Sequence, residues 1–205
     1  MAQLTADGRV LVVDLAGDAV RAATGSMVAY TGTVEFAGAG VGGGDGLRAA
    51  LKRRAGGESL SLMECRGTGR VHLAVDALQV TVVDLTGDTL KVESEALLAV
   101  TAGLRLDVAF AGLGGATAGQ GVATTTVTGN GQVALLSDGP LIALEVDPGE
   151  PLVVDPDAFV ASSGVLSTSL VSGVSWRSLV GEGSGEAFSM RFDGSGLVLL
   201  QPAER

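Results

Sequence analysis

The sequence of 205 residues contains a single cysteine, Cys65, and a single histidine, His72. One cysteine cannot form a disulfide within the chain, which excludes a scaffold stabilised by internal disulfides. One histidine cannot build a histidine-rich metal site, and no G-x-S-x-G motif supports a nucleophilic hydrolase. Aromatic residues make up only 3% of the chain. The core must therefore be aliphatic, built mainly from Val, Leu and Ala.

Basic residues are also scarce, because 13 Lys and Arg stand against 23 Asp and Glu and give a formal net charge of −10. Proteins that bind nucleic acid need clustered positive charge, so we expect no nucleic-acid partner as a main function. No run of about 18 apolar residues occurs, so we expect no membrane-spanning helix. The first residues, MAQLTADGRV, resemble neither a signal peptide nor an Arg-rich presequence. We therefore expect a cytoplasmic protein.

Glycine is abundant, with 32 residues that cluster between apolar runs, and one glycine-containing phrase is repeated. VVDLAGD at 12–18 returns as VVDLTGD at 82–88, and a weaker third copy lies at 145–164. The third copy contains Asp-Pro-Gly-Glu, in which Pro favours the first central position of a turn and Gly favours the second. We interpret all three copies as strand–turn–strand units.

A second pattern follows each copy, a Gly-x-Gly sequence that leads into an apolar run, at 66–74, 128–136 and 193–201. We interpret these as hairpins whose turn is the Gly-x-Gly sequence. The chain is then all-β, one compact domain at 1–205 made of three repeats. Repeats of this size bury their apolar faces against one another, here about a pseudo-threefold axis. We expect the three repeats to span residues 10–75, 76–138 and 139–201.

The Gly-rich connection of the first repeat matches a nucleotide-binding fingerprint. Gly38, Gly40 and Gly43 satisfy G-x-G-x-x-G, but that motif functions in a βαβ unit, and here a Gly-x-Gly hairpin is expected next. Glycines also fill the corresponding connections at 112–121 and 181–185. We therefore expect repeated Gly-rich connections and no cofactor. We also expect no metal, because the acidic stretch around 145–157 lacks calcium-loop spacing.

A short helix is expected after these glycines, with Asp45 as its N-cap and a basic C-terminal end that the helix dipole favours. A second short helix could lie at 175–181. The basic end is either a solvated end of a covering helix or a contact for an anion, and Trp and Arg are enriched at binding hot spots. These considerations give a candidate binding surface of five residues: Lys52, Arg53, Arg54, Trp176 and Arg177.

Three segments, GSMVAYTGTVEF (25–36), LKRRAGGESLSLMECRGTGRVHLA (51–74) and GSGEAFSMRFDGSGLVLLQPAE (183–204), resemble the altered-inheritance-of-mitochondria protein twenty-four family. The resemblance implies three subdomains similar to the tryptophan RNA-binding attenuation protein (TRAP), each a double-stranded β-helix or β-sandwich. Because TRAP assembles into rings, it also implies a homo-oligomer, for example a trimer with nine subdomains. The fungal namesake is associated with the mitochondrial inner membrane, where it supports assembly of the cristae-organising complex. Without a presequence, that location is not expected here.

The expected function is that of a non-enzymatic structural or assembly protein, which offers a rigid β surface for self-association and for partner proteins not yet identified. No catalytic residue is assigned, because acid–base chemistry would have to proceed without histidine support. The alternative is a binding module for a small ligand or nucleic acid, with its site in the grooves between subdomains.

Overall fold

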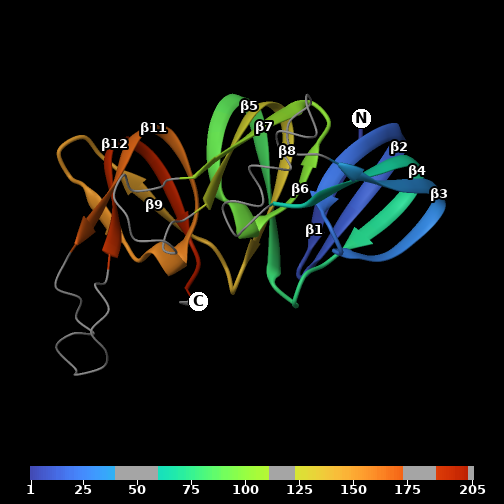
Figure 1. Cartoon of the computed structure of the whole chain (residues 1–205), viewed down its shortest axis with the longest axis horizontal. Helices are drawn as coiled ribbons and strands as arrows, with labels where there is room; N and C mark the ends of the chain where they lie inside the picture. Colours follow the sequence, from blue (N-terminus) through green and yellow to red (C-terminus); the bar gives the residue numbers. More distant parts are fainter. Residues whose placement is uncertain (40–59, 111–122, 173–187, 203–205) are drawn as a thin grey trace.

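The computed structural model describes residues 1–39, 60–110, 123–172 and 188–202, and these ranges are all-β (Figure 1). They contain twelve strands in one antiparallel sheet, two three-residue 3-10 helices and no α-helix. Within the same ranges no helix has the length and apolar character needed to span a bilayer. The all-β prediction is confirmed. The short helices expected in the Gly-rich connections fall outside the described residues.

The strands follow one another closely along the chain. In order, the elements are β1 (Gln3–Asp7), β2 (Val10–Ala23), β3 (Met27–Ala39), β4 (Leu62–Leu73), β5 (Gln79–Glu93), η1 (Ser94–Ala96), β6 (Leu97–Thr101), β7 (Leu104–Phe110), β8 (Ala123–Ser137), β9 (Ile142–Val146), β10 (Leu152–Val154), η2 (Pro156–Ala158), β11 (Phe159–Ser172) and β12 (Phe188–Leu200). The sheet order is β10-β12-β11-β5-β8-β6-β2-β4-β3, with β1 added to β2, β7 to β8 and β9 to β12. The path therefore ends at β10 and at β3.

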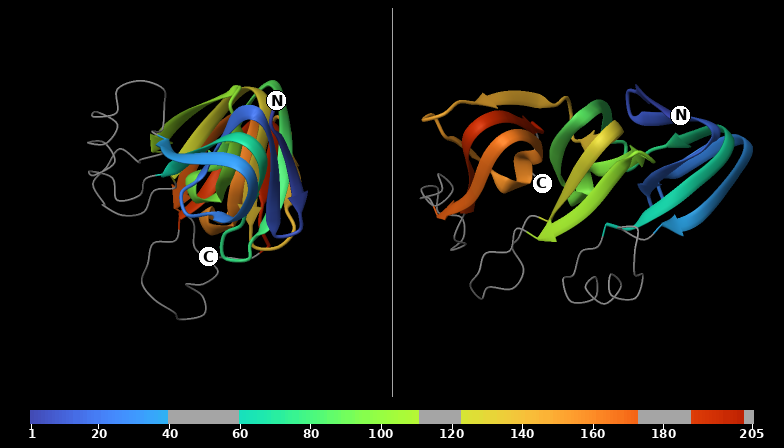
Figure 2. Two further views of the ribbon diagram at one scale, coloured as in Figure 1. Left: turned by 90° about the vertical axis from the view of Figure 1, so that its right-hand side faces the viewer. Right: turned by 90° about the horizontal axis from the view of Figure 1, so that it is seen from above.

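Three central strands organise this sheet. β4 lies between β2 and β3, β8 lies between β5 and the pair β6 and β7, and β12 lies between β11 and the pair β9 and β10. We refer to β1–β4, β5–β8 and β9–β12 as the first, second and third strand groups. The groups lie in a row along the long axis of the molecule (Figures 1 and 2), and among the described strands the β2–β6 and β5–β11 ladders are the only ladders between neighbouring groups.

The predicted strand–turn–strand unit is wrong for the first two copies of the repeated phrase and is confirmed for the third, where a turn bridged by Asp147 and Glu150 lies between β9 and β10. β2 and β5 run straight through the phrase, and each shows a register shift there, at Gly17 and at Gly87. These glycines have φ values of +84° and +95°, so each forms a β-bulge in a continuous strand. In the third copy Glu150 N–H donates to the Asp147 carbonyl and closes a turn. Even there, the flanking strands β9 and β10 pair with β12 and not with each other.

The Gly-x-Gly sequences are not turns either, because β4, β8 and β12 each continue through them. In β4 these glycines allow close approach of β3. A Cβ added at Gly67 would lie 2.1 Å from the Thr33 carbonyl oxygen, and one at Gly69 would lie 2.0 Å from that of Thr31. The sequence signal for glycine was correct, but its cause is close packing of two backbones in a curved sheet.

The apolar side chains form three core clusters, one centred on each strand group. The first includes Leu11 and Val71, and also Leu98 from the second group. The second cluster likewise receives Val160 from the third group. Among the described residues, the third cluster contains only residues of β9–β12 and of η2, and its two phenylalanines, Phe159 and Phe192, stack with ring centroids 5.5 Å apart. Neighbouring groups therefore share core residues, whereas the third cluster receives none from another group.

Candidate functional site

The candidate binding surface expected from the sequence falls outside the described residues. Lys52, Arg53 and Arg54 precede residue 60, and Trp176 and Arg177 lie between residues 172 and 188. The structure therefore neither brings these residues together nor separates them, and the anion-contact hypothesis stays a prediction.

The two single-copy residues with reactive side chains both lie on β4. Cys65 is 1% exposed, and burial raises the pKa of its thiol to about 11. The thiol is therefore protonated at neutral pH, which makes it a poor nucleophile. His72 alternates with the fully buried Val71 and Leu73, as expected for a strand. In the described part of the chain, no three His, Cys, Asp or Glu gather closely enough to hold a metal ion.

The surface of the sheet carries ion pairs between arginine and carboxylate. Across β4 and β2, Arg70 Nε donates to Asp14 Oδ1 at 2.7 Å, and Arg70 Nη2 donates to Asp14 Oδ2 at 3.2 Å. These hydrogen bonds are the main reason that the pKa of Asp14 is lowered, and they raise the pKa of Arg70. Arg66 makes a similar pair with Glu64, 2.8 Å apart, on β4 itself.

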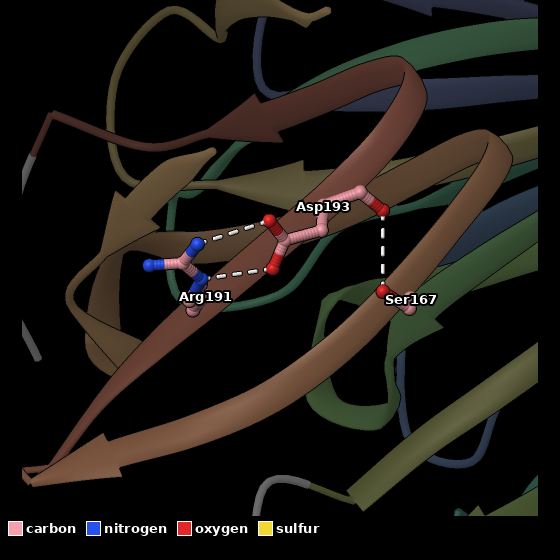
Figure 3. Close-up of polar contacts among 3 residues, drawn as sticks. All are labelled: Ser167, Arg191 and Asp193. Carbon is pink, nitrogen blue, oxygen red and sulfur yellow. Dashed lines mark hydrogen bonds and ion pairs between the residues drawn. The ribbon is translucent and has the colours of Figure 1, made fainter. Parts of the chain in front are cut away.

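A third pair, Arg191 and Asp193, lies on β12 in the third strand group (Figure 3). Arg191 donates to both carboxylate oxygens, with Nε to Oδ2 at 2.8 Å and Nη2 to Oδ1 at 3.1 Å. This bidentate contact lowers the pKa of Asp193. Ser167 on β11 donates its hydroxyl hydrogen to the Asp193 carbonyl oxygen at 3.3 Å. The guanidinium of Arg191 is thus engaged by its own strand.

Exposed apolar side chains occur at both ends of the sheet path, as they also do on β9 and β11. At one end, Val28 and Tyr30 are 64% and 48% exposed, in the first residues of β3. At the other end, Val153 of β10 is 54% exposed. We name Met27–Thr31 the β3 edge and Leu152–Val154 the β10 edge. Both are strand edges with unpaired backbone groups on one side among the described residues, and such edges are templates for pairing with another chain.

The two ladders between strand groups show what the same type of edge looks like when it is covered. Val100 of β6 and Ala161 of β11 are both fully buried where their strands join β2 and β5. At the first of these ladders Arg21 Nη2 also donates to the Leu104 carbonyl oxygen. Pairing at a group boundary therefore buries apolar side chains and binds a charged one to the backbone.

The comparisons with known proteins agree with this architecture. The family model described as Mitochondrial biogenesis AIM24 matches residues 3–203. The chain belongs to the AIM24 family. The crystal structure of protein SPYM3_0169 from Streptococcus pyogenes is similar to this AIM24-family chain, with a TM-score of 0.77 and 22% identity over 100% of this chain and 94% of that chain. At this identity the likeness shows the fold. No curated protein matches the chain.

Sequence reasoning did not identify the two edges as candidate sites. The segment Met27–Thr31 aligns with Leu97–Thr101, and both are apolar, so their sequences give equal reason to expect burial. The difference between them depends on which strands find a neighbour. The only signal in the sequence was the position of Met27–Thr31 in the first repeat and of Leu152–Val154 in the last.

Proposed function

We propose that this AIM24-family chain is a non-enzymatic structural protein that joins chains through its sheet edges, in self-association and in assemblies with partner proteins. The observation that carries the proposal is the exposure of Val28, Tyr30 and Val153 on edges with unpaired backbone groups. Extended strands that add to such an edge gain backbone hydrogen bonds, and the apolar side chains add specificity. This gives the rigid sheet a function that depends on shape.

We also propose that the three strand groups are copies of one TRAP-like β-sandwich or double-stranded β-helix unit, with the limits 10–75, 76–138 and 139–201. Support comes from the central strands, each of which carries a Gly-x-Gly sequence between two flanking strands. In each central strand, the residue two positions before the first glycine pairs with a residue of β2, β5 or β10. These pairs are Cys65 with Val20, Val127 with Leu90, and Phe192 with Leu152. A threefold axis through the units stays a prediction.

Light scattering after size-exclusion chromatography tests the structural function. The chain has a mass of 20.4 kDa, and we expect a particle whose mass is a multiple of this value, together with partner proteins retained in an affinity pull-down from the native host. A monomer at every concentration that retains no partner would contradict the proposal.

The expected absence of a nucleic-acid partner belongs to the same proposal. Arg66, Arg70 and Arg191 each bind a carboxylate, which reduces the positive charge they present to a phosphate backbone. Filter binding over a salt series checks this, because phosphate contacts weaken steeply with salt. Salt-dependent retention of RNA or DNA would favour the alternative binding module. The cytoplasmic location also stays a prediction, for which fractionation of the native host is the test.

A further inference from the structure

We propose that the chain associates head to tail, with the β10 edge of one copy paired antiparallel to the β3 edge of a second copy. The inference rests on the proposed function and specifies the surface through which it acts. In the proposed register three pairs face each other, with the second residue of each pair in the second copy: Leu152 with Thr31, Val153 with Tyr30, and Val154 with Ala29.

The same type of pairing already occurs twice inside the chain. Each ladder between strand groups joins three residues after the bulge in β2 or β5 to the three residues that follow the register shift in β6 or β11. The ladder between the first and second groups pairs Val20 with Thr101, Arg21 with Val100, and Ala22 with Ala99. The ladder between the second and third groups pairs Leu90 with Ser163, Lys91 with Ser162, and Val92 with Ala161.

The β10 edge is equivalent to the β2 and β5 residues of these ladders, and the β3 edge is equivalent to the β6 and β11 residues. Leu152 pairs with Phe192, which lies two residues before the first glycine of the Gly-x-Gly sequence in β12. Val20 and Leu90 pair with the equivalent residues of β4 and β8. Tyr30 faces Val71, two residues after the second glycine. Val100 and Ser162 face the corresponding residues of β8 and β12. Among the described strands, β10 pairs with β12 alone and has a free edge at the ladder position, and β3 has a free edge that would receive it.

The residue at the bulge near the start of each receiving strand, β3, β6 or β11, supports the same pairing. The register shifts at Val28 in β3, at Leu98 in β6 and at Val160 in β11. A bulge redirects a side chain, and here Leu98 and Val160 are fully buried in the core cluster of the preceding group. Val28 belongs to the first of the described groups and is 64% exposed. In a second copy it would enter the third core cluster, which receives no residue from a neighbouring group.

The charges of the two edges permit this contact although each chain carries a net charge of −10. Neither Met27–Thr31 nor Leu152–Val154 contains a charged residue. Val153 stands where the inner ladders have Arg21 and Lys91, so the outer ladder would place a valine opposite Tyr30. An aromatic side chain opposite a β-branched one is a favourable cross-strand pair. The edge between chains is therefore more apolar than the ladders inside the chain.

Disulfide trapping tests the pairing directly. Residues that face each other in an antiparallel ladder have Cα atoms about 4.5–5.5 Å apart, which is within the range that a disulfide bridges. Chains with Tyr30→Cys and chains with Val153→Cys are mixed and oxidised, and we expect a covalent dimer that contains one chain of each type. Wild type controls for the buried Cys65. Val165→Cys in place of Val153→Cys controls for chance collision, because Val165 is 84% exposed on β11.

Cross-linking of Tyr30→Cys chains with one another, or equal yields with Val165→Cys, would overturn the head-to-tail arrangement. A second measurement is the mass of Val28→Lys and of Val153→Lys by light scattering. Both side chains are exposed within a single chain, so each variant should fold, but each would bury an unpaired charge in the contact. We expect the dissociation constant to rise more than about 100-fold. Lysine also reduces the net negative charge, so dissociation would not come from added repulsion.

These outcomes separate the inference from the proposed function. If wild type is oligomeric and Val28→Lys leaves its mass unchanged, the self-association proposed above stands and the pairing of these two edges is wrong. If wild type is a monomer that retains no partner, both are wrong. A head-to-tail contact closes into a ring or grows into a filament, depending on the rotation between copies, and either product with the trapped disulfide supports the inference.

Discussion

The replacement Gly69→Ala tests whether close approach of β3 and β4 explains the glycines of the central strands. The backbone φ at Gly69 is +152°, and a Cβ there would lie 2.0 Å from the Thr31 carbonyl oxygen. The unfavourable φ costs about 1–3 kcal/mol. Moving β3 away to relieve the clash costs about 1–3 kcal/mol more. We therefore expect the free energy of unfolding to fall by about 2–6 kcal/mol, a large share of the total of about 5–15 kcal/mol that is typical of a domain.

Urea denaturation followed by far-UV circular dichroism measures this effect, with two matched controls. Gly25 has a φ of +86° but no atom within 4 Å of an added Cβ, so Gly25→Ala isolates the backbone cost. Gly38 has neither an unfavourable φ nor an atom within 4 Å, so Gly38→Ala should stay within about 0.5 kcal/mol of wild type. The reasoning would be refuted if Gly69→Ala were no less stable than Gly25→Ala.

Three further predictions concern side chains. Hydrogen bonds from Arg70 lower the pKa of Asp14, so the ionised carboxylate stabilises the fold at pH values above its usual pKa of 3.8. This contribution is lost as the pH falls through the lowered pKa. Carboxyl NMR titration should show a midpoint below 3.8 that rises in Arg70→Gln. Cys65, with a pKa of about 11, should react with a thiol reagent at pH 8 about 100-fold or more slowly than in the urea-unfolded chain. Phe192→Ala removes a buried ring that stacks on Phe159 and should destabilise the fold by about 3–5 kcal/mol in urea denaturation.

The fold class and the turn at Asp147–Glu150 were predictable from the sequence, whereas the roles of the other repeated glycines were not. Strand alternation such as Val71, His72 and Leu73 depends on local sequence, and the structure follows it. A glycine with positive φ, however, serves equally in a turn, in a bulge or at a close backbone contact. At Gly17 and Gly67 the choice is made by strands that are distant in the sequence, because β4 continues past the bulge in β2 and β3 continues past Gly67. Local patterns do not contain that information.

The candidate site was less predictable for a related reason. The expected basic residues lie outside the described ranges, and the edges that carry the proposal consist of ordinary apolar strand residues. Val28 and Leu98 align in the repeat and occupy equivalent bulges, yet Val28 is 64% exposed and Leu98 is fully buried. Exposure here depends on how many groups the chain contains and on which group comes first.

A row of three groups joined by two equivalent ladders necessarily leaves one ladder edge of each kind unpaired. Natural proteins commonly protect such edges with lysine or proline, because an exposed apolar edge promotes aggregation. The β3 edge Met27–Thr31 contains neither residue, whereas the β10 edge is three residues long and directly follows Pro151. The two edges are complementary in position, because the third core cluster lacks the side chain that Val28 would supply. An unprotected β3 edge that is complementary in position to the opposite end of the same molecule supports the contact between copies that we propose.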